Sequence, residues 1–274
     1  MSSFLLFNGH LRPETGFTLP LPNRGLMFSD GFFETLVWTA GRLRYAAHHA
    51  ARMQRAATAL ELALPAALAS AEALAGTLGA LTTANRQPTT RLRLQLWRGG
   101  GGLYAPGTDA CEWLATARPF EPQDESVAAA GFAETVRTVA SPLAFCKGPQ
   151  AWLYVLAAQE RQQRGLGELL LLDAAGHVAE AVAAAVLWVR GGALFTPHLR
   201  TGCVAGVRRA HLLARAQAHG VAVHEVLAVP AEVLAAEAVF TANVAGIRAV
   251  ARLAETELAT EHPLLQQLRE WDAV

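Results

Sequence analysis

Hydrophobic and polar residues alternate strictly over Thr90–Trp97, which predicts a strand with one buried face. Leucines occupy one side of this strand, and arginine and glutamine occupy the other. Two earlier stretches, Arg44–Leu62 and Pro65–Ala84, have the apolar spacing of helices, and the second would begin at its proline. A further strand is predicted over Glu112–Thr116, so the N-terminal portion mixes helices with strands.

The pattern changes after Arg118–Pro122, which has the composition of a linker. We expect one helix from Pro149 to Gly165, a second from Gly206 to His219 and a short one after Pro230. Further strands are predicted at residues 133–139, 169–172, 178–189, 193–195, 221–226 and 238–241. The interpretation is a two-domain α/β (α+β) chain, with domains at residues 1–118 and 124–274.

Composition narrows the classes of function. The 23 basic residues balance the 23 acidic ones, so there is no overall field that would attract nucleic acid or an anionic membrane. The longest apolar run, Ala181–Val189, is about half of the ~20 residues that span a bilayer. The first residues of the sequence lack the cationic leader of a signal peptide. The three cysteines and nine histidines show no metal-ligand spacing. We therefore expect a soluble cytoplasmic protein without a metal site.

Lys147 is the only lysine among the 23 basic residues. Arginine serves wherever a positive charge suffices, but its guanidinium stays protonated and cannot attack a carbonyl as a neutral amine. Apolar residues surround Lys147, and desolvation there would lower the pKa of the amine and make it a better nucleophile. The pattern indicates a chemical role, although a chance surface lysine is the alternative.

Two further segments carry residues suited to particular chemistry: one to binding an anion, the other to a buried charge. Gly202–Arg209 places two glycines and two arginines at a predicted helix start, where backbone N–H groups and guanidinium can hold a phosphate. Glu180 stands alone in an apolar run, so if buried it needs a cationic or hydrogen-bonding partner. An ordinary helix start and an outward-facing glutamate are the alternatives.

Motifs along nearly the whole chain resemble the class-IV aminotransferase family. The matching segments are Phe7-Asn8-Gly9, Asn23-Arg24-Gly25-Leu26, Ser29–Thr35, His49–Met53, Arg98-Gly99 with Tyr104-Ala105-Pro106, Lys147, Glu180, Thr196-Pro197, Gly206–Arg209 and Gly246–Val250. The resemblance implies the two-domain fold-type IV architecture of pyridoxal-phosphate (PLP) enzymes, similar to D-amino-acid aminotransferase. It also implies a homodimer that holds PLP between two domains.

The resemblance assigns roles residue by residue. Lys147 would form the Schiff base with PLP and move protons at the substrate carbon. Glu180 would face the pyridine nitrogen and keep it protonated. The residues that would contact the phosphate are Arg52, Gly206, the backbone N–H groups of Val207 and Arg208, Thr241 and Asn243.

The chain departs from the family at several of these positions. Val182 and Ala185 replace a small hydroxyl residue and an asparagine, and Gln150 replaces another asparagine. Arg208 replaces the hydroxyl residue of the glycine-rich helix start, and Asn243 replaces a serine. Hydroxyl contacts to the phosphate are lost, and one hypothesis is that the Arg208 side chain takes over part of that work.

The substrate side favours one reaction among three. Phe28 stands where branched-chain aminotransferases usually have tyrosine, and Leu103–Ala105 lacks the Arg-x-His pair with which D-amino-acid aminotransferases bind a carboxylate. Phenylalanine before Asp-Gly and an Arg-Gly turn ending in Tyr104 are similar to aminodeoxychorismate lyases. This predicts cleavage of 4-amino-4-deoxychorismate to 4-aminobenzoate, a folate precursor, with Arg93, and Arg98 second, as carboxylate partners. Aminotransferase activity on branched-chain or D-amino acids is the alternative, and a non-catalytic PLP-binding protein is a minor one.

Overall fold

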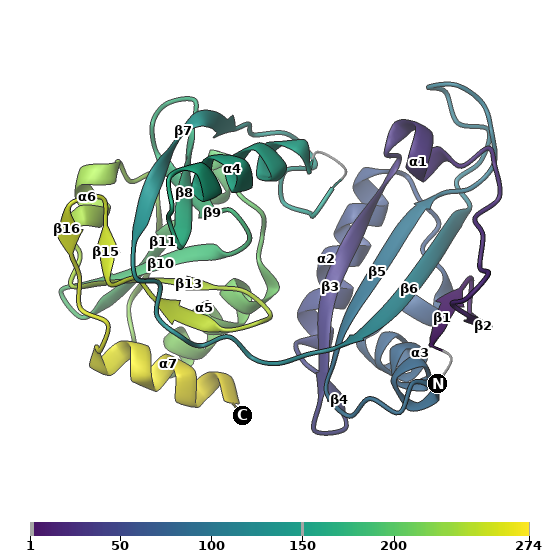
Figure 1. The fold of residues 1–274 in the computed structure, drawn as a ribbon, viewed down its shortest axis with the longest axis horizontal. Coiled ribbons are helices and arrows are strands. Elements are labelled where there is room, and N and C mark those ends of the chain that lie inside the picture. The colour runs from purple at the N-terminus through teal and green to yellow at the C-terminus, as the bar shows by residue number, and fades with distance from the viewer. Residues whose placement is uncertain (1–2, 149–150, 274) are drawn as a thin grey trace. The chain divides into compact units, whose positions relative to one another are not determined.

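The chain forms two compact units in a computed structural model, which describes residues 3–148 and 151–273 (Figure 1). Unit 1 contains Met1–Glu121 and Cys146–Gln150, and unit 2 contains Pro122–Phe145 and Ala151–Val274. The first crossing between units lies at the predicted linker. Sequence analysis places Lys147 on the C-terminal domain, whereas its packing assigns it to unit 1. Within unit 1, the Phe33 N–H donates to the Lys147 carbonyl at 2.9 Å.

Unit 1 is built on a six-stranded antiparallel sheet in the order β2-β1-β6-β5-β3-β4. Its strands are β1 (Phe4–Phe7), β2 (His10–Pro13), β3 (Gly31–Thr39), β4 (Arg42–Leu43), β5 (Thr90–Arg98) and β6 (Cys111–Pro119). Its helices are α1 (Arg24–Phe28), α2 (Ala46–Ala59), the 3₁₀ helix η1 (Ala66–Leu68) and α3 (Ala71–Ala84).

The predicted strand at residues 90–97 is confirmed as β5, and its alternation is confirmed as far as Leu96, after which Trp97 and Arg98 are also buried. Leu92 and Leu94 are fully buried, while Arg91, Arg93 and Gln95 are exposed. The buried face belongs to a core that also includes side chains of α2 and α3. The arginine-bearing face of the sheet therefore remains available for polar chemistry.

Unit 2 contains two five-stranded sheets, β12-β11-β10-β13-β14 and β16-β15-β7-β8-β9. The strands are β7 (Ala130–Thr138), β8 (Glu168–Asp173), β9 (Val178–Ala181), β10 (Ala185–Arg190), β11 (Ala193–Pro197), β12 (Val223–Val226), β13 (Ala238–Ala242), β14 (Ile247–Ala249), β15 (Arg252–Leu253) and β16 (Thr256–Glu257). The helices are α4 (Trp152–Gln163), η2 (Leu199–Thr201), α5 (Val207–Ala218), α6 (Pro230–Leu234) and α7 (Pro263–Ala273).

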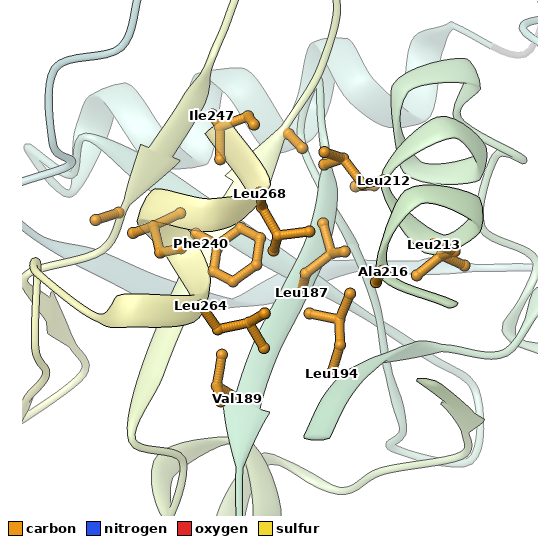
Figure 2. Packing of buried hydrophobic residues seen from close by; sticks show 14 residues of the cluster. Leu187, Val189, Leu194, Leu212, Leu213, Ala216, Phe240, Ile247, Leu264 and Leu268 are labelled. Atoms are coloured by element: carbon orange, nitrogen blue, oxygen red, sulfur yellow. The ribbon is translucent and has the colours of Figure 1, made fainter. Parts of the chain in front are cut away.

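One hydrophobic cluster fixes α5 and α7 against the first of these sheets. Figure 2 shows Leu187 of β10 and Phe240 of β13 facing Leu212 of α5 and Leu268 of α7. All four side chains are fully buried. The apolar residues of α7 recur at a spacing of three to four, which is the pattern of a helix that buries one stripe. This cluster holds the start of α5 and the end of α7 in fixed positions within unit 2.

The structure corrects two predicted elements. The helix expected over residues 65–84 is two elements, η1 and α3, because Ser70 interrupts it and its Oγ accepts from Ala73 N–H at 3.1 Å as an N-cap. The strand expected over residues 178–189 is also two, β9 and β10, which belong to different sheets. A turn in which Ala181 N–H donates to the Ala184 carbonyl separates them. The predicted helix start at Pro149 lies outside the described residues.

Candidate active site

A buried ionic group of three side chains lies between β3 and α2 in unit 1. Glu34 extends from β3, and His49 and Arg52 extend from one face of α2, three residues apart. Arg52 Nε donates to Glu34 Oε1 at 2.7 Å, and Arg52 Nη2 donates to Oε2. His49 Nδ1 lies 2.7 Å from the same Oε2. The carboxylate thus fixes the orientation of the Arg52 guanidinium.

The charges of this group are coupled. Burial works against ionisation of Glu34, but the Arg52 charge and the His49 hydrogen bond outweigh it and lower the pKa of the carboxyl to about 2. Burial lowers the pKa of His49 despite its hydrogen bond to Glu34, and the charge of Lys147 adds to this effect. Glu34 is therefore ionised opposite Arg52, and the burial of His49 favours its neutral form.

Lys147 is held next to this group through its backbone. Its carbonyl accepts from Phe33 N–H, one residue before Glu34 on β3, at 2.9 Å. Its side chain is half-buried, and Phe145 and Cys146 before it are buried. The backbone of the only lysine in the sequence is therefore anchored to the sheet of unit 1.

Arg98, the second predicted carboxylate partner, is used structurally instead. It is 6% exposed, and its Nε donates to Asp30 Oδ2 at 3.0 Å. Its Nη1 donates to the Glu61 carbonyl at 3.0 Å, and its Nη2 donates to the Leu60 carbonyl. The expectation that Arg98 binds substrate is not supported, because its donors already hold these backbone groups.

Phe28 and Tyr104, both predicted substrate residues, are brought together in unit 1. Their ring centroids lie 5.6 Å apart, and the Arg24 guanidinium lies 5.0 Å from the Phe28 centroid. Arg24 also donates to Asp30 at 2.8 Å and to the Leu103 carbonyl at 2.6 Å. Arg24 therefore links helix α1 to the glycine-rich loop before Tyr104, a role that sequence reasoning missed.

Arg93 lies on the exposed face of the same sheet. Its guanidinium carbon is 3.2 Å from the centroid of the Phe33 ring, the residue next to Glu34 on β3. Stacking of this kind orients a guanidinium while leaving its edge for a planar anion. Arg93 therefore remains the candidate partner of a substrate carboxylate.

Unit 2 holds Glu180 in the buried environment expected of a functional carboxylate. Glu180 lies on β9 and is 5% exposed, so the outward-facing alternative is wrong. Tyr154 Oη donates to its Oε1 at 2.8 Å, and Val204 N–H donates to its Oε2 at 3.2 Å. The predicted need for a hydrogen-bonding partner is confirmed. Tyr154 itself was not anticipated from the sequence.

The start of α5 presents unpaired donors. Gly206 is the N-cap residue and provides no side chain, and the backbone N–H groups of Val207, Arg208 and Arg209 have no acceptor among residues 3–148 and 151–273. Such groups together with the helix dipole favour an anion. The expected anion-binding chemistry at this helix start therefore fits the donor set.

The Arg208 side chain does not extend as the hypothesis required. It is 5% exposed, and its Nε and Nη2 donate to Asp272 at 3.2 and 2.5 Å. Its Nη1 donates to the Asn243 carbonyl at 2.8 Å. The idea that this guanidinium replaces a missing hydroxyl at the phosphate is thus not supported, because a carboxylate and a carbonyl occupy it.

Thr241 lies near the end of β13, and Asn243 follows directly after the strand. Thr241 is 2% exposed. Asn243 Oδ1 accepts from Ala245 N–H at 2.8 Å, and its Nδ2 donates to the Ala183 carbonyl at 3.1 Å. The Asn243 side chain thus shapes the turn that follows β13.

The family model for amino-transferase class IV matches residues 31–253. The chain belongs to this family. Within the class IV family, an aminodeoxychorismate lyase from Vibrio harveyi is 25% identical over 255 residues, which cover 90% of this chain and 91% of the relative.

Solved structures show the shared fold of the class IV enzymes. A branched-chain aminotransferase from Thermoproteus uzoniensis, determined with norvaline, has a TM-score of 0.88 and 23% identity, covering 100% of this chain and 94% of its own. The Escherichia coli branched-chain aminotransferase also has a TM-score of 0.88, at 17% identity, with 98% and 93% covered. A protein described as a 4-amino-4-deoxychorismate lyase from Legionella pneumophila has a TM-score of 0.84 and 21% identity, with 94% and 95% covered. The fold-type IV prediction is therefore confirmed.

Val182 and Ala185, two of the residues expected to differ from the family pattern, lie at buried positions. Val182 is 8% exposed and Ala185 is 9% exposed, so each apolar side chain faces the interior. Gln150 lies outside the described residues. Within the described part of the chain no group of three or more His, Cys, Asp or Glu side chains could hold a metal ion. No described helix is long and apolar enough to cross a membrane.

Proposed function

We propose that this class IV enzyme binds PLP through Lys147 and cleaves 4-amino-4-deoxychorismate to 4-aminobenzoate and pyruvate, a step of folate biosynthesis. The observation that carries the cofactor part is the position of the only lysine, anchored by its carbonyl to β3 beside the Glu34–Arg52 pair. The lyase part is supported by the relationship to the Vibrio harveyi enzyme and by the contact between Phe28 and Tyr104.

The donor set fits a phosphate ester on an aromatic ring. In unit 2, the unpaired N–H groups at Val207 and Arg208, after Gly206, would bind the phosphate, and the β13 end with Thr241 and Asn243 would add contacts. Asn243 would do so through its backbone, because its side chain is engaged. In unit 1, the family resemblance assigns Arg52 to the phosphate as well; Glu34 engages its Nε and Nη2 and so holds the guanidinium in one orientation.

The residues have separate chemical tasks. When bound, PLP supplies an aldehyde that captures an amine and a ring that accepts electron density from the captured carbon. The Lys147 amine would hold the cofactor aldehyde and, when free, would take the proton from the substrate carbon that bears the amino group. Glu180, fixed by Tyr154 and Val204, holds a proton on the ring nitrogen. Arg93 binds a substrate carboxylate. Removal of that proton would let the bond between the neighbouring ring carbon and the enol oxygen break, so that the ring becomes aromatic. The enol that leaves would take a proton back and become pyruvate.

Two measurements test this function. Borohydride reduction of the purified protein followed by peptide mapping should place the cofactor on Lys147, and Lys147→Arg, which keeps the charge, should stay colourless. Incubation with 4-amino-4-deoxychorismate should release 4-aminobenzoate and pyruvate in equal amounts. Keto-acid formation from D-alanine, L-leucine or L-glutamate without 4-aminobenzoate would instead identify an aminotransferase. A coloured protein that turns over none of these would be a non-catalytic binder, and a colourless wild type would refute the proposal.

The proposal includes a cytoplasmic homodimer, which rests on the family resemblance. The test is light scattering at micromolar concentration, with an expected mass of twice the 29.1 kDa of the chain. A mass equal to one chain in the presence of PLP would contradict it.

A further inference from the structure

A buried ion pair ties the last turn of α7 to the first turn of α5. Asp272 is 6% exposed and accepts from two nitrogens of Arg208, at 3.2 and 2.5 Å. The third nitrogen of the guanidinium donates to the Asn243 carbonyl at 2.8 Å. One side chain thus connects three segments of unit 2, which are the start of α5, the turn after β13 and the end of the C-terminal helix.

This connection has no obvious value for stability alone. Burial of two charges costs desolvation free energy that their attraction offsets only when further hydrogen bonds complete the geometry, and apolar side chains are often as stabilising at such a position. Here all three nitrogens of the Arg208 guanidinium donate, two of them to the carboxylate oxygens of Asp272 and one to the Asn243 carbonyl. A complete fork instead fixes relative position, because all three bonds must be satisfied together.

The segments that the pair joins are those that would hold the phosphate. The start of α5 carries the unpaired N–H groups of Val207 and Arg208. The turn after β13 follows Thr241 and is shaped by Asn243, whose Oδ1 accepts from Ala245 N–H at 2.8 Å. Misplacement of either segment would lengthen bonds to a phosphate without affecting the aldehyde or the ring.

We propose that Arg208 and Asp272 are positioning residues that preorganise the phosphate-binding segments of unit 2, so that the C-terminal helix contributes to cofactor retention. The proposal rests on the proposed function, since it assumes that PLP is the ligand. In this proposal the Arg208 side chain holds the binding segments in position on the side away from the ligand, and the Arg208 backbone N–H binds the phosphate. Asp272 thereby acquires a role although it belongs to none of the family motifs.

The decisive comparison is PLP against pyridoxal, which has the same aldehyde and ring but no phosphate. Both are titrated into the apoprotein, and binding is followed by absorbance. Asp272→Asn should weaken PLP binding about tenfold, the equivalent of one charge-assisted hydrogen bond to the phosphate, and leave pyridoxal binding unchanged. A purely structural role would change both affinities by the same factor or neither, and either result would overturn the inference.

Two further variants serve as a control and as a substitute should Asp272→Asn fail to fold. Glu225→Gln removes a neighbouring ion pair, Arg209 to Glu225 at 2.6 Å, which starts from the same turn of α5 but does not involve Asn243. It should leave the PLP-to-pyridoxal ratio at the wild-type value. If Asp272→Asn fails to fold, the double variant Arg208→Met/Asp272→Leu removes both charges and leaves neither unpaired. It should fold and lose the phosphate preference, and retention of that preference would overturn the inference. Absence of PLP binding by the wild type would refute the proposed function itself, whatever the variants do.

Discussion

Glu34→Gln is the substitution whose effect the structure defines best. The carboxyl is fully buried, and its pKa falls from 4.5 to about 2 in the folded protein. A displacement of this size corresponds to ~3 kcal/mol in favour of the ionised, folded form at neutral pH. The same interaction can be judged from Arg52, whose charge the glutamine leaves buried without its partner carboxylate; typical costs are then about 3–5 kcal/mol, an alternative figure and not an addition. We expect the free energy of unfolding of the apoprotein to drop by ~3 kcal/mol at pH 7.

The effect has a defined pH dependence. Because the pKa of Glu34 is lower in the folded than in the unfolded chain, its contribution is complete above the unfolded value and is lost as the pH falls from about 4.5 to about 2. Other carboxyl groups titrate in the same window, so the quantity to follow is the difference between wild type and variant. Urea unfolding of both apoproteins, monitored by tryptophan fluorescence at several pH values, gives this difference.

The difference should be largest near neutral pH and should shrink steadily towards pH 2. Glu257→Gln is the matched control, since that side chain is 80% exposed and lies 4.0 Å from its nearest cation, Arg252. Its effect should stay within about 0.5 kcal/mol at every pH. A Glu34→Gln difference below about 1 kcal/mol at pH 7, or one that stays constant down to pH 3, would refute the reasoning that Arg52 and His49 hold this charge.

Three further predictions concern the reaction. Tyr154→Phe removes the hydroxyl that donates to Glu180 at 2.8 Å, so steady-state kinetics should show kcat about tenfold lower with KM little changed, and an effect on KM alone would contradict this. Arg93→Met should raise KM for a dicarboxylate substrate at least about tenfold and lower the free energy of unfolding by no more than about 1 kcal/mol, the loss of its stacking on Phe33. Arg98→Met should instead act mainly on stability and lower the free energy of unfolding by about 3 kcal/mol, since Asp30 keeps Arg24 but loses one arginine partner and the carbonyls of Leu60, Glu61 and Thr108 lose a donor. An unchanged unfolding curve with an increased KM would exchange the two roles.

The parts of the fold that local patterns determine could be predicted from the sequence. The strand at residues 90–97 was predictable because one of its faces is buried and the other is exposed, so the alternation is strict. The separation of residues 178–189 into two strands was not, because the residues of β9 and β10 within this run are buried and all of them except Glu180 are apolar. In such a run only the turn between Ala181 and Ala184 marks the change of sheet.

The candidate site divides in a similar way. Lys147 and Glu180 were recognisable because each is chemically exceptional in its surroundings. The residues that hold the site side chains in place were not recognisable, because they are distant in sequence. Tyr154 lies 26 residues from Glu180, and Asp272 lies 64 residues from Arg208. The direction of the Arg208 side chain was predicted wrongly for the same reason. A guanidinium at a helix start suits an anion, and the sequence does not reveal that a carboxylate near the C-terminus already binds it.

The path of the chain between its two units has a practical consequence. The polypeptide leaves unit 1 after Glu121 and returns to it with Cys146 and Lys147, so neither unit is a continuous piece of sequence. If the gene were cut after codon 121, the larger product would carry Lys147 and the smaller one the Phe33 N–H that binds its carbonyl. With Lys147 in its proposed role, the coloured cofactor adduct should form only when the two products reassemble, and its absorbance would serve as a built-in reporter of fragment complementation.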